Sequence, residues 1–397
     1  MGNKNRMKCD IVIIGGGIIG SAAAYFLAVS GRAGSIAVIE PDPGYSKAST
    51  PAGAGGVRRL MCRPENIRMS RFSLEFYAGF QDVMATADHP ADIQFRREGY
   101  LFLASADGED DLRRNFDRQI AEGVPAELLE RSALRARFPS IGIDNVAVAC
   151  HSPQDAWIDP HAALIGFRKK AEDLGVRYLP DRVMSLDRAG SAVSRALLQS
   201  GDQVVGDVFL NTAGAWAGEI AAMTGARLPV VPMCRVQHFW RCAHEIEPMP
   251  LVKDESGVFF RPEGRGFVGG RPSWDIAPGF IWDIHSGYFA NYFEDTVWGL
   301  IAEVVPKFET IKLERSWGGH YAQNVFDGNM IIGRYSEGIE NLYTACGFSG
   351  HGIMHAPAVG RALSELSLHG AFQSLDLTKL GFQRVLDDEP YGEEGIR

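Results

Sequence analysis

The residues that point most directly to chemistry are glycines near the start of the chain. Gly15, Gly17 and Gly20 form the pattern G-x-G-x-x-G immediately after an apolar run at residues 11–14. Glu40 follows twenty residues beyond Gly20, at the end of a second apolar run. When such glycines lie between a strand and a helix and an acid follows at this distance, the pattern is typical of a dinucleotide-binding site.

Each residue of this pattern has a physical role. Gly15 permits the tight turn, Gly17 lets a pyrophosphate approach the backbone, and Gly20 lets the helix pack closely on the sheet. The N-terminus of the helix offers unpaired N–H groups and a partial positive charge to the phosphates. Glu40 would accept hydrogen bonds from a ribose and disfavour a 2′-phosphate, so the pattern favours FAD or NAD over NADP.

A pair of arginines, Arg58 and Arg59, follows a second glycine-rich loop at 53–56. Adjacent arginines are costly to bury without an anionic partner. A bidentate contact between a guanidinium and a carboxylate contributes about 1.5–3 kcal/mol and fixes the orientation of the anion. The pair predicts either a site for a substrate carboxylate or two surface side chains, and the surface position is the better prediction for Arg59.

A third glycine-rich segment, residues 347–352, precedes a predicted helix and contains His351. Its three glycines allow backbone N–H groups to face a planar ring, and the helix N-terminus would stabilise negative charge there. His351 and His355 could share one helix face, but no carboxylate stands at a matching spacing. We therefore predict no metal site, a position for His351 beside cofactor or substrate, and a packing role for His355.

Strands and helices are predicted to alternate around these motifs. Residues 10–14 and 35–40 are typical of buried strands, and the alanine-rich segment 21–30 between them is typical of a helix, which together indicate a parallel βαβ unit. Further helices are predicted at 66–84, 109–122, 161–174 and 353–368, and further strands at 99–104, 177–179, 208–212, 230–240, 258–261, 266–270 and 342–345.

The middle of the chain differs from its ends. Residues 228–317 contain predicted strands joined by turns and carry most of the seven tryptophans, which favours an antiparallel sheet. We predict a mixed α/β fold in which a Rossmann-type cofactor domain is interleaved with an antiparallel-sheet substrate domain. The cofactor domain would comprise residues 1–84, 145–227 and 318–397, and the substrate domain residues 85–144 and 228–317.

Composition excludes several classes of protein. Among 397 residues, 46% are hydrophobic and 22% charged, which argues against a disordered or fibrous chain. The net charge of −9 argues against nucleic-acid binding. No apolar run approaches the ~20 residues of a membrane span, and six cysteines without a CxxC pair indicate reduced thiols, so we expect a cytoplasmic protein. The acidic end, 387–394, is predicted to be solvated.

The chain also resembles the family of FAD-dependent oxidoreductases that includes D-amino-acid oxidase, glycine oxidase, sarcosine oxidase and dimethylglycine dehydrogenase. Beside the first glycine pattern, the resemblance rests on residues 55–58, 157–160, 211–216 and 346–352, and it is strongest for the sarcosine oxidase branch. It implies that the Rossmann-type domain binds FAD, rather than NAD, in an extended conformation, with the substrate over the flavin ring.

The resemblance and the glycine patterns together assign residues to the cofactor. They are Gly15, Gly17, Ile18, Ile19, Gly20, Glu40, Ser49, Thr50, Gly55, Gly56, Val183, Ala213, Gly214, Trp216, Gly350, His351, Gly352, Ile353 and Met354. Sarcosine oxidases attach the flavin through a cysteine at the position of Gly319, and relatives with a histidine attachment carry it in a loop that here lacks one. We therefore expect FAD to be bound non-covalently.

The resemblance also assigns the substrate site. Arg58 would bind a carboxylate, with Tyr321 and His351 beside it, for oxidation of the Cα–N bond of an amino acid or N-substituted amino acid through hydride transfer to flavin N5. Val268 stands near the position of the lysine that promotes reaction with oxygen in sarcosine oxidase, which leaves the electron acceptor open between oxygen and a carrier. Met354 stands where the family has a further lysine, so one contact to the substrate carboxylate is also missing. Two alternatives are a 2-hydroxy-acid dehydrogenase of the same superfamily and a flavin-bound assembly protein with little turnover.

Overall fold

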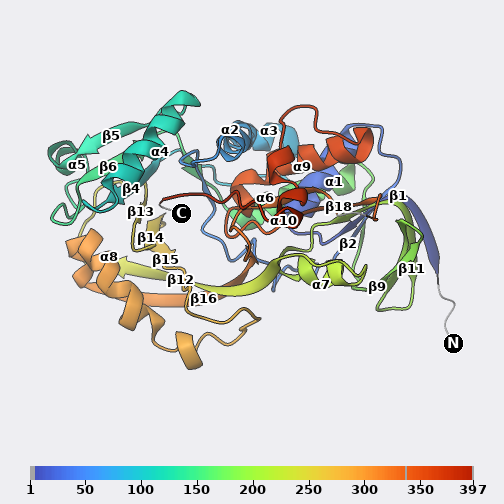
Figure 1. The fold of residues 1–397 in the computed structure, drawn as a ribbon. Coiled ribbons are helices and arrows are strands. Elements are labelled where there is room, and N and C mark those ends of the chain that lie inside the picture. Colours follow the sequence, from blue (N-terminus) through green and yellow to red (C-terminus); the bar gives the residue numbers. More distant parts are fainter. Residues whose placement is uncertain (1–4, 336–337, 396–397) are drawn as a thin grey trace.

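Two large β-sheets organise the protein, and each draws its strands from distant parts of the chain (Figure 1). The computed structural model describes residues 5–335 and 338–395. The first sheet has the strand order β17-β18-β11-β1-β2-β8, and β10 and β9 continue from β11. Its strands are β1 (Arg6–Ile14), β2 (Ile36–Ile39), β8 (Arg177–Leu179), β9 (Val183–Ala189), β10 (Ala192–Leu198), β11 (Gln203–Asn211), β17 (Ile331–Arg334) and β18 (Leu342–Cys346).

The central strands of this sheet are parallel, as the βαβ prediction requires. β1 pairs in parallel with both β2 and β11, and β11 pairs in parallel with β18. Helix α1 packs against α6 and α9, and α2 also packs against α9. The helices of this part are α1 (Ile18–Val29), α2 (Pro64–Ala78), α3 (Phe80–Met84), α6 (Pro160–Asp173), α7 (Ala217–Ala222), α9 (Gly352–His369) and α10 (Gln383–Leu386).

The second sheet has the order β16-β12-β15-β14-β13-β4-β6-β5. All its pairs are antiparallel except β4 with β13. Its strands are β4 (Tyr100–Ala104), β5 (Glu127–Glu130), β6 (Val148–Ser152), β12 (Val230–Cys242), β13 (Leu251–Asp254), β14 (Phe259–Glu263), β15 (Gly266–Gly270) and β16 (Ile311–Asn324). The helices of this part are α4 (Glu109–Ala121), α5 (Arg131–Arg137) and α8 (Trp298–Val304). The long strands β12 and β16 extend from this sheet toward the first one (Figure 1).

The predicted mixed α/β fold is confirmed, with local differences. The helix expected at 66–84 is divided at Gly79 into α2 and α3. The 14-residue strand β16 lies between the strands predicted at 266–270 and 342–345, where no strand was predicted. Residues 148–152 pair in the second sheet as β6, although the proposed division places residue 145 onward in the cofactor domain. The division of the chain into domains stays a prediction.

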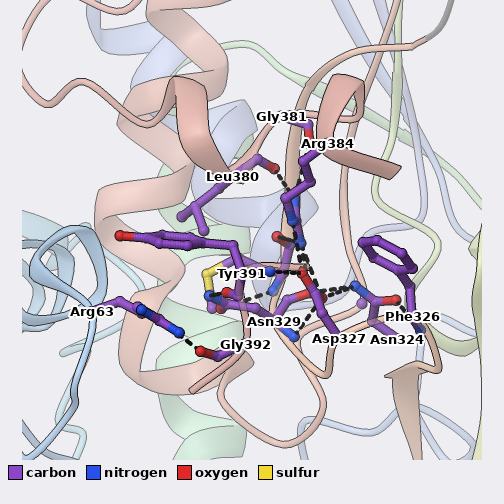
Figure 2. A network of polar contacts seen from close by, with 12 residues as sticks. Arg63, Asn324, Phe326, Asp327, Asn329, Leu380, Gly381, Arg384, Tyr391 and Gly392 are labelled. Atoms are coloured by element: carbon purple, nitrogen blue, oxygen red, sulfur yellow. Dashed lines mark hydrogen bonds and ion pairs between the residues drawn. The ribbon is translucent and has the colours of Figure 1, made fainter. Parts of the chain in front are cut away.

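The acidic end was predicted to be solvated, and residues 387–390 and 394 are indeed exposed, but residues 391–393 are anchored and the prediction is wrong for them. Tyr391 N–H donates to Asp327 Oδ2 at 3.0 Å, and Asp327 forms a buried ion pair with Arg384 at 2.8 Å (Figure 2). The Glu393 carboxylate is 7% exposed and accepts a hydrogen bond from Cys62 N–H at 2.6 Å. Within the part of the chain that the structure describes, no helix is long and apolar enough to cross a membrane.

Candidate cofactor and substrate site

A single cavity of about 600 Å³ brings together almost all of the predicted site residues, which lie on both sheets and the loops between them. The predicted residues that line it are Gly15, Gly17, Ile18, Ile19, Glu40, Ser49, Thr50, Gly55, Gly56, Arg58, Val183, Ala213, Gly214, Trp216, Tyr321, Gly350, His351, Gly352, Ile353 and Met354. Of the predicted set, Gly20 alone does not line it. The structure thus unites segments separated by more than 300 residues, while the role of each stays a prediction.

The first glycine turn has the geometry that a pyrophosphate needs. Gly15 has φ +98°, and a Cβ there would lie 2.7 Å from the carbonyl oxygen of Thr212. No atom lies within 4 Å of the place where a Cβ of Gly17 would be, so the backbone is open to the cavity. A Cβ at Gly20 would collide with the carbonyl oxygen of Gly15, which explains why Gly20 packs behind the turn instead of lining the cavity.

Glu40 is held in place at the end of β2. Its Oε2 accepts a hydrogen bond from Gly16 N–H and its Oε1 from Asp42 N–H, both at 2.9 Å. Burial raises the pKa of Glu40, and the two backbone N–H groups act in the opposite direction. A carboxylate has about four lone-pair positions, so these two bonds leave acceptor capacity for the hydroxyls of a ribose.

The loop between β18 and α9 presents its backbone to the same cavity. Gly347, Ser349 and Gly350 all have positive φ, at +69°, +50° and +99°. A Cβ at Gly350 would lie 2.6 Å from the ring of Tyr321, so only glycine fits beneath that ring. The first N–H groups of α9 have no side-chain cap, and they give this end of the cavity a partial positive charge.

The two adjacent arginines have different partners, and the prediction that Arg59 lies at the surface is wrong. Arg59 is 7% exposed, and its Nε donates to Asp155 Oδ1 at 2.7 Å. Its backbone N–H donates to Asp155 Oδ2 at 3.0 Å. Asp155 itself is fully buried, so this ion pair neutralises the charge of Arg59 inside the protein, although the buried Nη2 of Arg59 has no hydrogen-bond partner among the described residues.

Arg58 lines the cavity and has no carboxylate partner in residues 5–335 and 338–395. It is 4% exposed and donates to the carbonyl oxygen of Leu60. Its guanidinium carbon lies 5.0 Å from the centre of the Phe102 ring, and its Nη2 lies 3.2 Å from His351 Nε2. Burial lowers the pKa of Arg58, and the nearby charge of Glu393 partly offsets this effect. Of the two arginines, Arg58 is therefore the one placed to meet an anion.

The other predicted side chains lie around Arg58. Tyr321, on β16, stands over Gly350 and lies 5.2 Å from the guanidinium of Arg235, and burial raises its pKa. His355 is fully buried, and its Nε2 lies 3.0 Å from Ser70 Oγ. Its ring stands edge-on to the ring of His351, with the two centroids 6.3 Å apart, so it packs behind His351.

Sequence reasoning missed Lys253 and Tyr100, which line the cavity from the second sheet. Tyr100 lies so close to Gly56 that a Cβ there would collide with its hydroxyl. Lys253 belongs to β13, a four-residue strand that was not predicted. The alternation of Leu251 and Lys253 on one side of this short strand is the signal that could have indicated it.

Comparison with known proteins identifies the class to which this fold and cavity belong. The family model described as FAD dependent oxidoreductase matches residues 10–366. The chain therefore belongs to the family of FAD-dependent oxidoreductases, its cofactor is FAD, and the resemblance stated from the sequence is confirmed at the level of the family. The sarcosine oxidase branch within it stays a prediction.

Individual relatives cover nearly the whole chain. It is 34% identical to FAD-dependent oxidoreductase domain-containing protein 1 of Xenopus laevis, over 98% of this chain and 85% of that protein. It is 27% identical to 4-methylaminobutanoate oxidase (formaldehyde-forming) of Paenarthrobacter nicotinovorans, over 90% of this chain but 43% of that protein. The crystal structure of L-proline dehydrogenase from P. horikoshii superposes with a TM-score of 0.84 and 27% identity, over 97% of this chain and 100% of that one.

Proposed function

We propose that this enzyme oxidises the Cα–N bond of an amino acid or N-substituted amino acid. The observation that carries the proposal is the buried guanidinium of Arg58, which faces the cofactor cavity without a carboxylate partner among the described residues. A buried cation without an anion is costly, and a substrate carboxylate would remove that cost. The names of an L-proline dehydrogenase and a 4-methylaminobutanoate oxidase among its relatives support an amino acid as substrate.

The protein's own contribution is binding and orientation. Arg58 would hold the carboxylate through two parallel N–H donors, and His351, 3.2 Å from Arg58 Nη2, would help to fix the guanidinium. Tyr321 would donate its hydroxyl to the same carboxylate, because burial keeps it protonated. The walls of the cavity would exclude water from the reacting Cα–H bond.

The chemistry that FAD supplies when bound is acceptance of a hydride at N5. The Cα–H bond would break with its electron pair leaving as hydride, and the lone pair of the neutral amine would form the C=N bond of an iminium ion. Water would then hydrolyse this ion outside the site. The loop with Gly347 and Gly350 and the N-terminus of α9 would favour added negative charge at their end of the cavity.

We further propose that FAD is held without a covalent bond. Glycine stands at position 319, where the sarcosine oxidases carry the cysteine that attaches the flavin. A Cβ at this position would collide with Ala52, at 2.5 Å from its Cβ, so a cysteine does not fit there without rearrangement. The loop that includes Thr50 and Gly53 contains no histidine. Cytoplasmic location remains our proposal from composition, and all six cysteines are free thiols, as that location favours.

The test is anaerobic mixing of the purified holoenzyme with a panel of amino acids, N-methyl amino acids and 2-hydroxy acids. We expect amino acids to bleach the visible flavin absorbance, and Arg58→Met to slow bleaching at least 100-fold while Arg135→Met, at an exposed helix position, leaves it unchanged. Bleaching by hydroxy acids alone would support the 2-hydroxy-acid dehydrogenase, and the absence of bleaching with every compound would support an assembly role.

Two further measurements use the same sample. Denaturation should release the flavin into the filtrate if it is bound without a covalent bond. Repetition of the mixing experiment in air identifies whether oxygen is the electron acceptor.

A further inference from the structure

A second cation enters the substrate end of the cavity from the second sheet. Lys253, on β13, is the register partner of Phe102 on β4 and of Phe259 on β14. Residues paired in this way project from the same face of a sheet. Phe102 is the ring over which the Arg58 guanidinium lies, and Lys253 and Phe259 both line the cavity. The face that carries Lys253 is therefore the face that meets Arg58.

Alternation along the strands supports this placement. Tyr100, Phe102 and Leu251 belong to one apolar cluster, which lies on the cavity side. Leu101 and Val252, the residues between them, belong to a different cluster on the opposite side of the sheet. A long side chain at position 253 must follow Leu251 toward the cavity.

Lys253 has no hydrogen bond or ion pair within the described parts of the chain, 5–335 and 338–395. The adjacent Asp254 is engaged elsewhere, since its Oδ1 accepts from Ser256 Oγ at 2.6 Å. Burial and the positive charge of Arg58 lower the pKa of Lys253 to about 7, and Asp254 acts weakly in the opposite direction. The ammonium is thus destabilised by its surroundings in the protein and would be stabilised by an anion.

A carboxylate in the cavity wall whose charge reaches Arg58 is bound by other groups. Glu393 also lines the cavity, but its two oxygens accept hydrogen bonds from the backbone N–H groups of Cys62 and Arg63 and from Asn66 Nδ2. Three donors hold this carboxylate beside α2. Arg58 and Lys253 are left as two cations that line one cavity and form no ion pair with a carboxylate in the described part of the chain.

We propose that Arg58 and Lys253 bind two different carboxylates of one substrate, so that the enzyme acts on dicarboxylic amino acids. The second carboxylate would lie on the side chain or on the N-substituent. A bidentate guanidinium satisfies one carboxylate by itself, whereas the ammonium of lysine acts as a point charge suited to a separate anion. This inference rests on the proposed function, because it takes the Arg58 carboxylate site as given.

The experiment measures binding and needs no turnover. The holoenzyme is titrated with malonate, succinate and glutarate and with the monoamide of each acid, which has the same shape and one charge fewer, while the flavin spectrum is followed. We expect at least one diacid to bind ten times more tightly than its monoamide. In Lys253→Met this ratio should fall to about one with the monoamide affinity unchanged, and Lys253→Arg should restore it.

Lys312→Met provides the matched control, because Lys312 is a 78% exposed lysine on β16. Equal affinities of diacid and monoamide for the wild-type protein would overturn the inference without any variant. An equal loss of both affinities in Lys253→Met would also overturn it, since both cations would then share one carboxylate. If monocarboxylic amino acids bleach the flavin and dicarboxylic ones do not, this inference fails and the proposed function stands. If diacids are preferred but no amine bleaches the flavin, the proposed function alone fails.

Discussion

At the scale of single residues, neighbouring arginines with the same chemistry are used in opposite ways. Arg59 is neutralised inside the protein by Asp155, whereas Arg58, one position earlier, lines the cavity. Both residues follow the short strand β3 (Gly56–Val57), and one arginine pairs with a buried carboxylate while the other lines the cavity. The buried pair has a structural role that should be separable from catalysis.

The pair of Arg59 and Asp155 gives a stability prediction. Arg59→Met leaves a fully buried carboxylate without its partner, and we expect the free energy of unfolding to fall by about 3–5 kcal/mol. The double variant Arg59→Met with Asp155→Leu should recover most of this loss, because the uncompensated charge is gone. Urea unfolding followed by tryptophan fluorescence measures both. A single variant within 1 kcal/mol of the wild type would contradict the assignment.

At the scale of elements, short loops between strands and helices determine the site. The loop between β18 and α9 places Gly350 directly under Tyr321 of β16, so that a helix N-terminus and a long strand meet at the cavity. The backbone there is in the left-handed region at three of four consecutive positions, Gly347, Ser349 and Gly350. At Gly350 this geometry depends on the absence of a side chain, because a Cβ there would collide with the Tyr321 ring.

Gly350→Ala tests that dependence. The new Cβ would lie 2.6 Å from the Tyr321 ring at φ +99°, and we expect a cost of about 1–3 kcal/mol at the loop. If this cost applies to the FAD-bound protein and not to the free protein, the affinity for FAD should fall by roughly 5- to 150-fold, because 1.4 kcal/mol corresponds to a factor of ten. Equilibrium dialysis measures the affinity for FAD. Gly299→Ala, with open space around its Cβ and no positive φ, is the matched control, and equal affinities of the two variants would contradict the prediction.

Elements with a strong local pattern could be predicted from the sequence, and elements defined by distant partners could not. The turn at Gly15 and Gly17 could be predicted because the glycine spacing, the preceding strand and the following helix lie next to one another in the sequence. Strand β16 (Ile311–Asn324) lacks clear alternation because its residues meet different surroundings along a strand that borders both parts of the molecule. The place of Lys253 depends on the pairing of β13 with β4, and the role of Asp155 depends on its contact with Arg59, 96 residues earlier. Neither can be read from the neighbouring residues in the sequence.

At the scale of the whole molecule, the C-terminal segment connects parts that contribute to the cavity. It passes from the first part of the structure to the edge of the second (Figure 1). Glu393 binds the start of α2, and Glu394 Oε2 pairs with Arg118 of α4 at 2.8 Å. The acidic composition of this segment predicted a solvated end. The local sequence could not indicate the contacts of Glu393 and Glu394, because the donors that bind these carboxylates lie more than 270 residues earlier.

Removal of residues 389–397 tests whether this segment supports the site. The truncation deletes several charge-assisted hydrogen bonds, each contributing about 1.5–3 kcal/mol, and leaves Asp327 and Arg63 with fewer partners. We expect a lower Tm of the holoenzyme and faster loss of FAD on gel filtration, because Glu393 also forms part of the cavity wall. Removal of residues 396–397 alone is the control and should change neither the Tm nor the retention of FAD.

The substitution Glu393→Gln should reproduce part of the effect, since it weakens the hydrogen bonds from Cys62 and Asn66 while the rest of the segment is kept. Unchanged FAD retention in the long truncation would show that the cavity is maintained without the segment.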